Sequence, residues 1–235
     1  VSRLAGGLAP AVLESVSVQR ARGIEAQVAT LRDPYTETDA APYGVPYQAA
    51  PGYPPLGYAP ALARRVFGQS PRPELVHIHG MWTYCDWLAL RVHDRFGIPL
   101  IASPHGMLRQ WAFAHRWWKK LPIWWLWERR KHAGAAAVVA TSPEEAQEMR
   151  ALGLRMPIAI IPHGLHLPAL TQPKPANAPR IALFLSRIHP VKGLPLLVEA
   201  VAKLRPTGWK FVIAGPGEDG HELAIQAAVQ AAGLT

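Results

Sequence analysis

The amino-acid sequence predicts an α/β protein made of two parallel-sheet, Rossmann-like units, the second of which is incomplete. Short apolar runs alternate with helix-like stretches along most of the 235 residues. A Pro-rich segment interrupts this alternation over residues 168–179, and the alternation then restarts. Hydrophobic residues make up 49% and charged residues 17% of the chain, which is typical of a globular protein.

The first unit is expected to span residues 1–168. Residues 8–22 have apolar side chains at helical spacing, and Gly23 follows as a common C-terminal stop. The apolar runs that predict strands are 24–30, 74–79, 98–103, 135–140 and 158–161. The stretches that predict further helices are 83–96, 108–131 with an interruption near Pro122, and 143–152. Residues 33–60 contain seven Pro and five Tyr without any period, so we expect a long irregular loop there.

A linker is expected over residues 169–179, because Pro recurs there among polar residues. The second unit is then expected over residues 180–235. It has two predicted strands, 180–186 and 209–214, and two predicted helices, 194–204 and 219–232. In parallel sheets of this kind ligands bind beyond the carboxyl ends of the strands and between domains.

Charge and cysteine content narrow the range of partners and compartments. The net charge of +9 favours an anionic partner, such as a phosphate-bearing ligand, a nucleic acid or an acidic membrane. The single cysteine, Cys85, excludes an intramolecular disulfide and a Cys-based zinc site. No apolar run reaches the length of a membrane-spanning helix, and no signal peptide is evident. We therefore expect a protein of a reducing compartment.

The turn Ser186-Arg-Ile-His-Pro-Val-Lys-Gly193 is a candidate phosphate site. Arg187 and Lys192 flank the start of a predicted helix, where the helix dipole already favours anions. Two cations at this positive end of the helix dipole are unfavourable on their own. A bound phosphate would remove this conflict, since helix N–H groups and both cations favour it. The alternative is a pair of solvated surface cations.

Two glycine-rich turns are weaker candidates of the same kind. Gly215 and Gly217 follow a predicted strand and would let the backbone approach a diphosphate. Gly6 and Gly7 precede the first predicted helix and could form an anion nest. Plain tight turns are the alternative for both.

Histidines follow three of the predicted strands. His105 lies in a turn after the strand 98–103, at the edge where a ligand would bind, and His163 follows the last strand before the linker. His77 and His79 are spaced so that both point to one face of a strand, which could suit a metal. No further ligand follows at suitable spacing, so we expect no metal site; hydrogen-bonding structural histidines remain the alternative.

Residues 108–132 concentrate both tryptophan and positive charge. They hold six of the nine Trp, and seven Lys or Arg against Glu128 alone. Basic residues interleaved with Trp favour an anionic membrane interface or stacking on single-stranded nucleic acid. A core helix with a solvated cationic face is the third interpretation. The residues expected at a membrane interface are Trp117, Trp118, Lys119, Lys120, Trp124 and Trp125.

These turns, in this order, resemble the family-4 retaining glycosyltransferases of the GT-B fold, of the bacterial exopolysaccharide or lipopolysaccharide type. The resemblance covers nearly all of the chain. Its motifs are GGLAPAVLESVSVQRARGIEAQV, HIHGMW, SPHGML, ATSPEEAQEMRALGL, AIIPHG, FLSRIHPVKGL and VIAGPGEDG, of which SRIHPVKG is the most specific. Residues 1–168 then correspond to the acceptor-side domain without its first strand, and 180–235 to the first half of the nucleotide-sugar-binding domain.

The resemblance implies a role for each matching residue. Arg187 and Lys192 would hold the donor diphosphate, and Gly6 and Gly7 would lie beside it. His105 would act as the catalytic residue by contacting the donor sugar near the scissile bond. Further residues implied at the donor cleft are Gly215, Gly217, Glu218 and His163, and on the acceptor side His79 and Arg109.

The chain departs from the family pattern at two places. The family usually has Asn where this chain has His163, so the role of that Asn does not transfer. The paired glutamates of the family (E-x7-E) do not occur in residues 1–235. We therefore expect a chain truncated at both ends with little or no transferase activity of its own.

The resemblance also sets the expected partners. They are a nucleotide-sugar donor and a lipid-linked or saccharide acceptor, without metal or other cofactor and without nucleic acid. Together with residues 108–132, this predicts a cytoplasmic protein peripheral to the inner face of the plasma membrane. The main alternative is a membrane- or nucleic-acid-binding module that acts through residues 108–132. Another GT-B enzyme, such as a nucleotide-sugar epimerase, is a third possibility.

Overall fold

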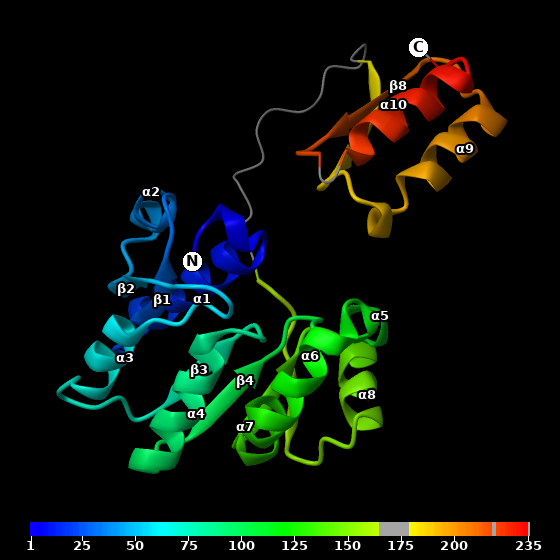
Figure 1. Cartoon of the computed structure of the whole chain (residues 1–235). Coiled ribbons are helices and arrows are strands. Elements are labelled where there is room, and N and C mark those ends of the chain that lie inside the picture. Colours follow the sequence, from blue (N-terminus) through cyan, green and yellow to red (C-terminus); the bar gives the residue numbers. More distant parts are fainter. Residues whose placement is uncertain (165–178, 218–219, 235) are drawn as a thin grey trace. The chain divides into compact units, whose positions relative to one another are not determined.

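A computed structural model of the chain describes residues 1–164, 179–217 and 220–234, and divides it into two compact units, Val1–Leu167 and Pro168–Thr235 (Figure 1). The predicted linker lies outside the described residues except for Pro179, and Glu218 also lies outside them. Both units combine parallel strands with helices, so the predicted α/β fold class is confirmed.

The larger sheet of the first unit has the strand order β3-β4-β5-β6, and all its strands run parallel. The strands are β3 (Val76–His79), β4 (Leu100–Ser103), β5 (Ala137–Ala140) and β6 (Ile158–Ile160). Helix α4 (Tyr84–Phe96) connects β3 to β4, and helix α8 (Pro143–Ala151) connects β5 to β6. Helix α4 begins at a capping box of Thr83 and Asp86 and ends at Gly97, whose φ of +65° suits glycine.

A second, two-stranded sheet corrects the expected loop over residues 33–60. Strand β1 (Val28–Arg32) pairs in parallel with β2 (Tyr47–Pro51), while α1 (Leu8–Ala21) precedes them. The short helices α2 (Thr36–Ala40) and α3 (Pro60–Phe67) flank β2. The prediction of an irregular loop was wrong because β2 lies at the sheet edge, where Pro is tolerated. Its buried residues, Ala49 and Ala50, are too small to give an apolar strand signal.

The segment after β4 is broken into four short helical pieces. They are α5 (Gln110–Ala114), α6 (Trp117–Ile123), a π-helical turn (Trp124–Glu128) and α7 (Arg129–Gly134). The break falls at Arg116, whose φ of +52° cannot continue a helix, and not at Pro122 as predicted. Pro122 lies inside α6, where it removes one helical N–H, and the π-helical turn follows directly.

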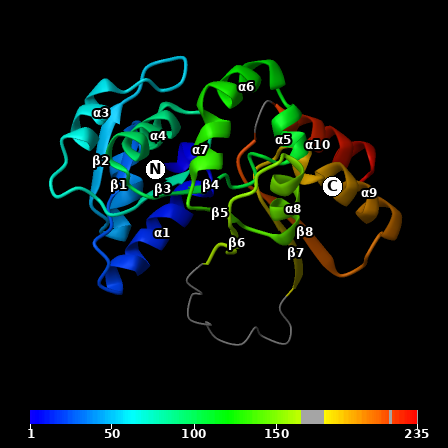
Figure 2. The ribbon, with the colours of Figure 1, turned by 90° about the horizontal axis from the view of Figure 1, so that it is seen from below.

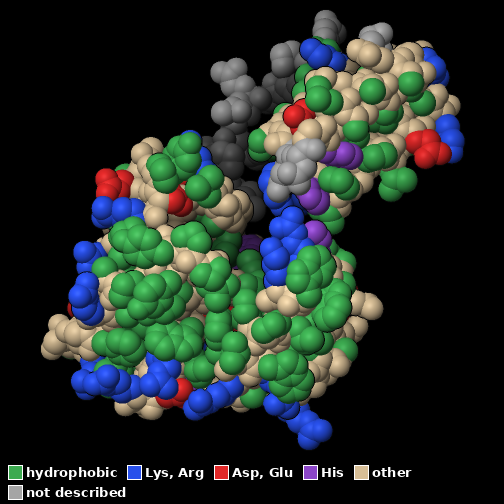
Figure 3. Space-filling view, viewed as in Figure 1, with side chains coloured by type: hydrophobic (Ala, Val, Ile, Leu, Met, Phe, Trp, Pro, Cys, Tyr) green, Lys and Arg blue, Asp and Glu red, His purple; other side chains and the backbone are tan. Residues whose placement is uncertain are grey.

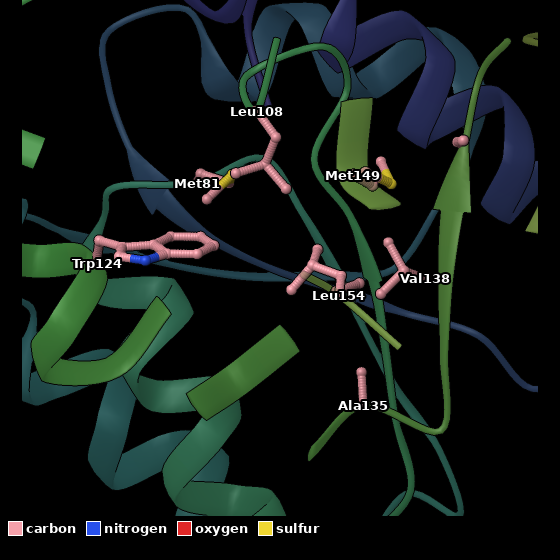
Figure 4. Close-up of a cluster of buried hydrophobic side chains, with 9 residues drawn as sticks. Met81, Leu108, Trp124, Ala135, Val138, Met149 and Leu154 are labelled. Atoms are coloured by element: carbon pink, nitrogen blue, oxygen red, sulfur yellow. The ribbon is translucent and has the colours of Figure 1, made fainter. Parts of the chain in front are cut away.

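Three apolar clusters hold the first unit together, and two of them involve the helices around the larger sheet. The first joins β4, β5 and α8 to Trp124, Met81 and Leu108, which come from segments outside the sheet (Figure 4). The second joins β2, α3 and α4 through buried residues including Ala50, Leu62 and Leu88. Helices α3 and α4 therefore link the two sheets of this unit. Figure 2 shows both helices beside the strands of the first unit.

The second unit has the strands β7 (Arg180–Leu185) and β8 (Trp209–Ala214), paired in parallel along their whole length. Helices α9 (Leu194–Leu204) and α10 (His221–Ala231) accompany them. Among the described residues of this unit, the buried hydrophobic ones are few: Leu194, Val198 and Ile225. A half-open cavity of about 710 Å³ lies among the apolar side chains of both strands and both helices, so these side chains are only partly covered.

Candidate functional site

Three turns of the first unit meet at the carboxyl edge of the larger sheet. The turn after β3 contains Gly80, whose φ is +88°. A Cβ atom at Gly80 would lie 3.4 Å from Leu8 Cδ2 and 3.7 Å from Met107 Cε. The start of α1, the turn after β3 and the turn after β4 are therefore in contact, at the edge where parallel sheets bind ligands.

Four histidines line this edge. His79 Nδ1 lies 3.0 Å from His105 Nε2, and His105 Nδ1 lies 3.3 Å from His163 Nε2. The ring of His77 lies 4.0 Å from that of His79, centroid to centroid, and His77 Nε2 lies 2.7 Å from Ser103 Oγ. The prediction that His77 and His79 share one face is confirmed. The sequence suggested a common cleft, but not a continuous chain of rings.

Burial keeps the inner members of this histidine chain neutral. Desolvation lowers the pKa of His79 to about 2, and the neighbouring imidazoles contribute to the same shift. Desolvation likewise lowers the pKa of His105 to about 4, although the charge of Glu145 opposes that shift. At neutral pH His105 is therefore an uncharged hydrogen-bonding group rather than a cation.

Glu145 holds the turn that carries His105. One oxygen of its buried carboxylate accepts the Gly106 N–H (2.6 Å), and the other accepts the N–H (2.7 Å) and hydroxyl (2.6 Å) of Thr141. His105 has a φ of +52°, a left-handed conformation that a non-glycine residue adopts only when its surroundings require it. Sequence reasoning missed this anchor, although a Glu three residues after the N-cap Ser142 is a known helix-start signal.

A buried charge cluster holds the turn after β3. Lys131 Nζ lies 2.5 Å from Asp86 Oδ1 and 2.7 Å from Glu128 Oε2, and all three side chains are almost fully buried. Glu128 Oε1 accepts the N–H of Trp82, which has a φ of +72°, while Asp86 Oδ2 accepts the N–H and hydroxyl of Thr83. Lys131 therefore belongs to the core, although the sequence placed it among the cations of residues 108–132.

Arg109 packs against the His105 turn from its C-terminal side. Its Cδ would lie 3.6 Å from a Cβ at Gly106, and its Nε lies 3.1 Å from Glu148 Oε2 on α8. On the other side of the edge, Gly6 has a φ of +60° and Gly7 is the N-cap of α1, which has no side-chain cap. Both glycines are exposed, and a Cβ at either one would meet no atom within 4 Å.

The two candidate phosphate turns of the second unit lie side by side. Ile188 N–H donates to the Pro216 carbonyl (2.8 Å), and Ser186 N–H donates to that of Ala214 (3.1 Å). A Cβ at Gly215, whose φ is +148°, would lie 1.8 Å from the Ser186 oxygen, so only glycine fits there. A Cβ at Gly217 would lie 2.1 Å from the Glu222 carboxylate, the end of a flexible side chain that would have to move.

The two cations flank the first of these turns. Arg187 follows β7, and Lys192 ends a 3₁₀ turn (Pro190–Lys192) that immediately precedes α9. Both side chains are exposed. His189 caps the 3₁₀ turn by accepting the Val191 N–H on Nδ1 (3.2 Å). The order strand, cationic turn, helix is the one that the sequence predicted.

The predicted membrane-interface residues separate into two groups. Trp117, Trp118 and Trp125 are 54%, 58% and 64% exposed, and Arg129 lies over the Trp125 ring at 5.3 Å. Trp124 is only 7% exposed and belongs to the core cluster with Met81 and Leu108 (Figure 4), so its assignment to the interface was wrong. Lys120 turns back and donates to the Ala112 carbonyl on α5, and burial lowers its pKa.

Metal ligands and membrane-spanning helices are both absent from the described part of the chain. Residues 1–164, 179–217 and 220–234 contain no group of three or more His, Cys, Asp or Glu side chains arranged to hold a metal ion. No helix in those ranges is long and apolar enough to cross a membrane.

Parallel α/β units with turns at the carboxyl ends of their strands are the architecture from which GT-B proteins are built. Residues 6–164 match the family model described as "Glycosyl transferase 4-like domain". The chain therefore belongs to the glycosyl transferase 4-like family of GT-B glycosyltransferases, as the sequence resemblance predicted.

Two curated relatives and a solved structure are similar to this chain. The GDP-mannose:cellobiosyl-diphosphopolyprenol alpha-mannosyltransferase of Xanthomonas campestris is 29% identical over 177 residues, covering 74% of this chain and 45% of that protein. The D-inositol 3-phosphate glycosyltransferase of Jonesia denitrificans is 28% identical over 254 residues, covering 90% of this chain and 58% of that protein. The crystal structure of Anabaena Alr3699/HepE in complex with UDP and glucose matches with a TM-score of 0.72 at 20% identity, covering 97% of this chain and 64% of that one. The chain thus spans about half the length of the curated relatives.

Proposed function

We propose that this chain forms part of a glycosyltransferase that moves a sugar from a nucleotide-sugar donor to a saccharide or lipid-linked acceptor. The observation that carries the proposal is the His105 turn, held in a left-handed conformation by Glu145 at the carboxyl edge of the sheet. The relatives named above support it, since one uses GDP-mannose and a polyprenol-linked acceptor by its name and a solved structure holds UDP and glucose.

The proposed reaction retains the anomeric configuration. The bond between the donor sugar C1 and the diphosphate oxygen breaks, and the acceptor hydroxyl bonds to C1 from the same face. The hydroxyl proton passes to the leaving phosphate, so no dedicated protein base is required. Arg187 and Lys192 would neutralise the departing diphosphate in place of a metal ion, and Gly6 and Gly7 would lie next to it. His105, neutral at pH 7, would hydrogen-bond the donor sugar near C1.

The donor cleft would also include Gly215, Gly217, Glu218 and His163. The acceptor side would include His79 and Arg109. We further propose that residues 1–235 alone have little or no transferase activity, because the family's paired glutamates are not among them.

Nucleotide binding tests the diphosphate assignment. Isothermal titration of the chain with UDP and with GDP measures the affinity, first for the unaltered protein and then for Arg187→Ala and Lys192→Ala. We expect at least one nucleotide to bind, and each substitution to weaken it about tenfold or more, as loss of a charge-assisted contact does. Lys203→Ala is the matched control, because Lys203 is an exposed cation of α9 paired with Glu199. Equal weakening by all three substitutions would contradict the assignment.

We also propose that the exposed Trp and cations of residues 108–132 dock the protein on an anionic membrane at the cytoplasmic face. The surface of the first unit shows apolar side chains interspersed with Lys and Arg (Figure 3). The exposed tryptophans are Trp111, Trp117, Trp118 and Trp125, and exposed cations nearby include Arg116, Lys119 and Arg129. Trp rings at the headgroup level and cations facing anionic lipid stabilise such docking.

Flotation with vesicles tests this membrane proposal. Binding is expected with vesicles containing phosphatidylglycerol and not with phosphatidylcholine alone. Replacing Trp117 and Trp118 together by Ser should release the protein, whereas Trp209→Ser in the second unit, also at an exposed Trp (46%), should not. Binding of single-stranded RNA at the same salt concentration, without vesicle binding, would instead favour the nucleic-acid module.

A further inference from the structure

The three rings of His79, His105 and His163 form an unbroken hydrogen-bonded chain that occupies both nitrogens of His105. The contacts are His79 Nδ1 to His105 Nε2 (3.0 Å) and His105 Nδ1 to His163 Nε2 (3.3 Å). Successive rings also stack, at centroid separations of 5.2 Å and 5.0 Å. Such a chain fixes both the position and the plane of the middle ring.

A neutral imidazole has one N–H donor and one acceptor nitrogen. For a neutral His105, both hydrogen bonds must therefore run in the same direction along the chain, either from His163 towards His79 or the reverse. The tautomer of His105 is thus tied to the tautomers of both neighbours. Burial favours the neutral form, because it lowers the pKa of His105 to about 4.

The two ends of the chain differ. His79 is half-buried in β3 and packs at 4.0 Å on His77, which is itself hydrogen-bonded to Ser103. His163 is exposed in the turn after β6, and its contact with His105 is the longer of the two. A ligand that reaches His105 from solvent can replace His163 more readily than it can replace His79. The nitrogen that becomes available is then Nδ1.

We propose that His79 and His163 are positioning residues for His105: His79 fixes its orientation through Nε2, and His163 holds Nδ1 until a ligand hydroxyl displaces it. The ligand class rests on the proposed glycosyltransferase function, but the coupling of the tautomers does not.

Long-range ¹H–¹⁵N correlation of the ¹⁵N-histidine-labelled chain reports the tautomer of each ring without any substrate. In the unaltered protein His105 should show one dominant neutral tautomer at pH 7. His79→Leu and His163→Leu should each abolish this, with the Nδ1 and Nε2 signals of His105 moving towards their average. His115→Leu is the matched control, because His115 is exposed and lies outside the chain of rings.

Conservative variants separate a positioning role from a general loss of structure. An Asn side chain places its amide near the Nδ1 position of a His, and a Gln side chain near the Nε2 position. His79→Asn and His163→Gln should therefore retain the single tautomer that the Leu variants lose, with unchanged circular dichroism. A His105 signal that is the same in all variants and in the control would overturn the proposal, even if every protein is folded.

Titration with UDP-glucose and with GDP-mannose then tests which nitrogen is released. The Nδ1 signal of His105 should move on binding while Nε2 stays constant. Movement of Nε2 alone would overturn the assignment of the two ends. Absence of binding by either donor would contradict the proposed function of this chain, while the Leu variants would still decide the tautomer coupling.

Discussion

At the residue scale, the candidate site depends on buried polar side chains that do not themselves face a ligand. His105 has a left-handed backbone and two imidazole partners, and Glu145 accepts the N–H of the following residue. A sequence motif such as SPHG identifies the turn, since His and Gly after an apolar strand indicate a site at the sheet edge. It does not identify Glu145, because this residue is remote from the turn in sequence and lies at a helix start, where Glu is common.

Glu145→Gln is the sharpest test of this anchor. Glutamine keeps the size of the side chain but has one acceptor oxygen, so either the Gly106 or the Thr141 N–H loses its partner. An unsatisfied buried N–H costs about 1–3 kcal/mol in the free energy of unfolding, measured by urea denaturation. The neighbouring Glu144→Gln serves as control, because Glu144 is exposed. Equal effects of the two substitutions would show that Glu145 anchors nothing.

His132 predicts an acid sensitivity of folding. Its ring is fully buried, its Nδ1–H donates to the Glu128 carbonyl, and burial followed by the charge of Lys131 lowers its pKa to about 3. An unfolded imidazole takes up its proton near pH 6.5. Between about pH 6.5 and 3 the unfolded chain therefore binds a proton that the folded chain does not. The free energy of unfolding consequently falls as the pH is lowered through this range, by at most about 1.4 kcal/mol per unit for this group.

His132→Phe should reduce that pH dependence, and urea unfolding at pH 5, 6, 7 and 8 measures it. The slope of the free energy of unfolding against pH is the quantity to compare, since the substitution also changes packing and hence the absolute stability. The same change at exposed His115 should leave the slope unaltered. An unchanged slope in the His132 variant would mean that its ring is protonated in the folded chain.

At the element scale, the segment over residues 108–134 shows why composition alone predicts only part of a structure. Its composition correctly indicated helix and an exposed Trp-rich surface, but not which residues face inward. A break at Arg116 and a π-helical turn shift the helical phase, so that Trp124, Glu128, Lys131 and His132 become buried. A regular 3.6-residue period cannot predict faces across such breaks. The strands of the larger sheet, in contrast, follow directly from short apolar runs.

Lys131→Met tests the buried cluster that connects this segment to the turn after β3. The substitution leaves the carboxylates of Asp86 and Glu128 together in the core, where burial already raises the pKa of Glu128. Removing one member of a buried ion pair typically costs about 3–5 kcal/mol of folding free energy. Arg130→Met is the matched control: Arg130 is exposed and pairs with Asp94 at the surface, where a pair contributes about 0–1 kcal/mol. Urea denaturation yielding similar losses for both variants would contradict the cluster's role.

At the scale of the whole molecule, the sequence predicted two α/β units because the alternation of strands and helices stops and restarts. It missed the parallel β1–β2 sheet, since its edge strand contains small residues and Pro. It also could not show how unevenly the buried surface is distributed. The first unit has three clusters of buried hydrophobic residues, whereas the described part of the second has one.

This uneven packing predicts different local stabilities in one chain. Leu183 and Leu185 of β7 are 58% and 74% exposed, and the apolar cavity of about 710 Å³ lies beside the same strands. Few buried contacts mean a small free-energy cost of local opening. Amide hydrogens of β7 and β8 should therefore exchange at least about tenfold faster than those of β4 and β5, a difference of about 1.4 kcal/mol. Hydrogen exchange with mass spectrometry at pH 7 measures both sheets in one sample. Equal protection would show that the two units unfold as a single cooperative structure. A partner that covers the exposed face of β7 would then be needed to explain its stability.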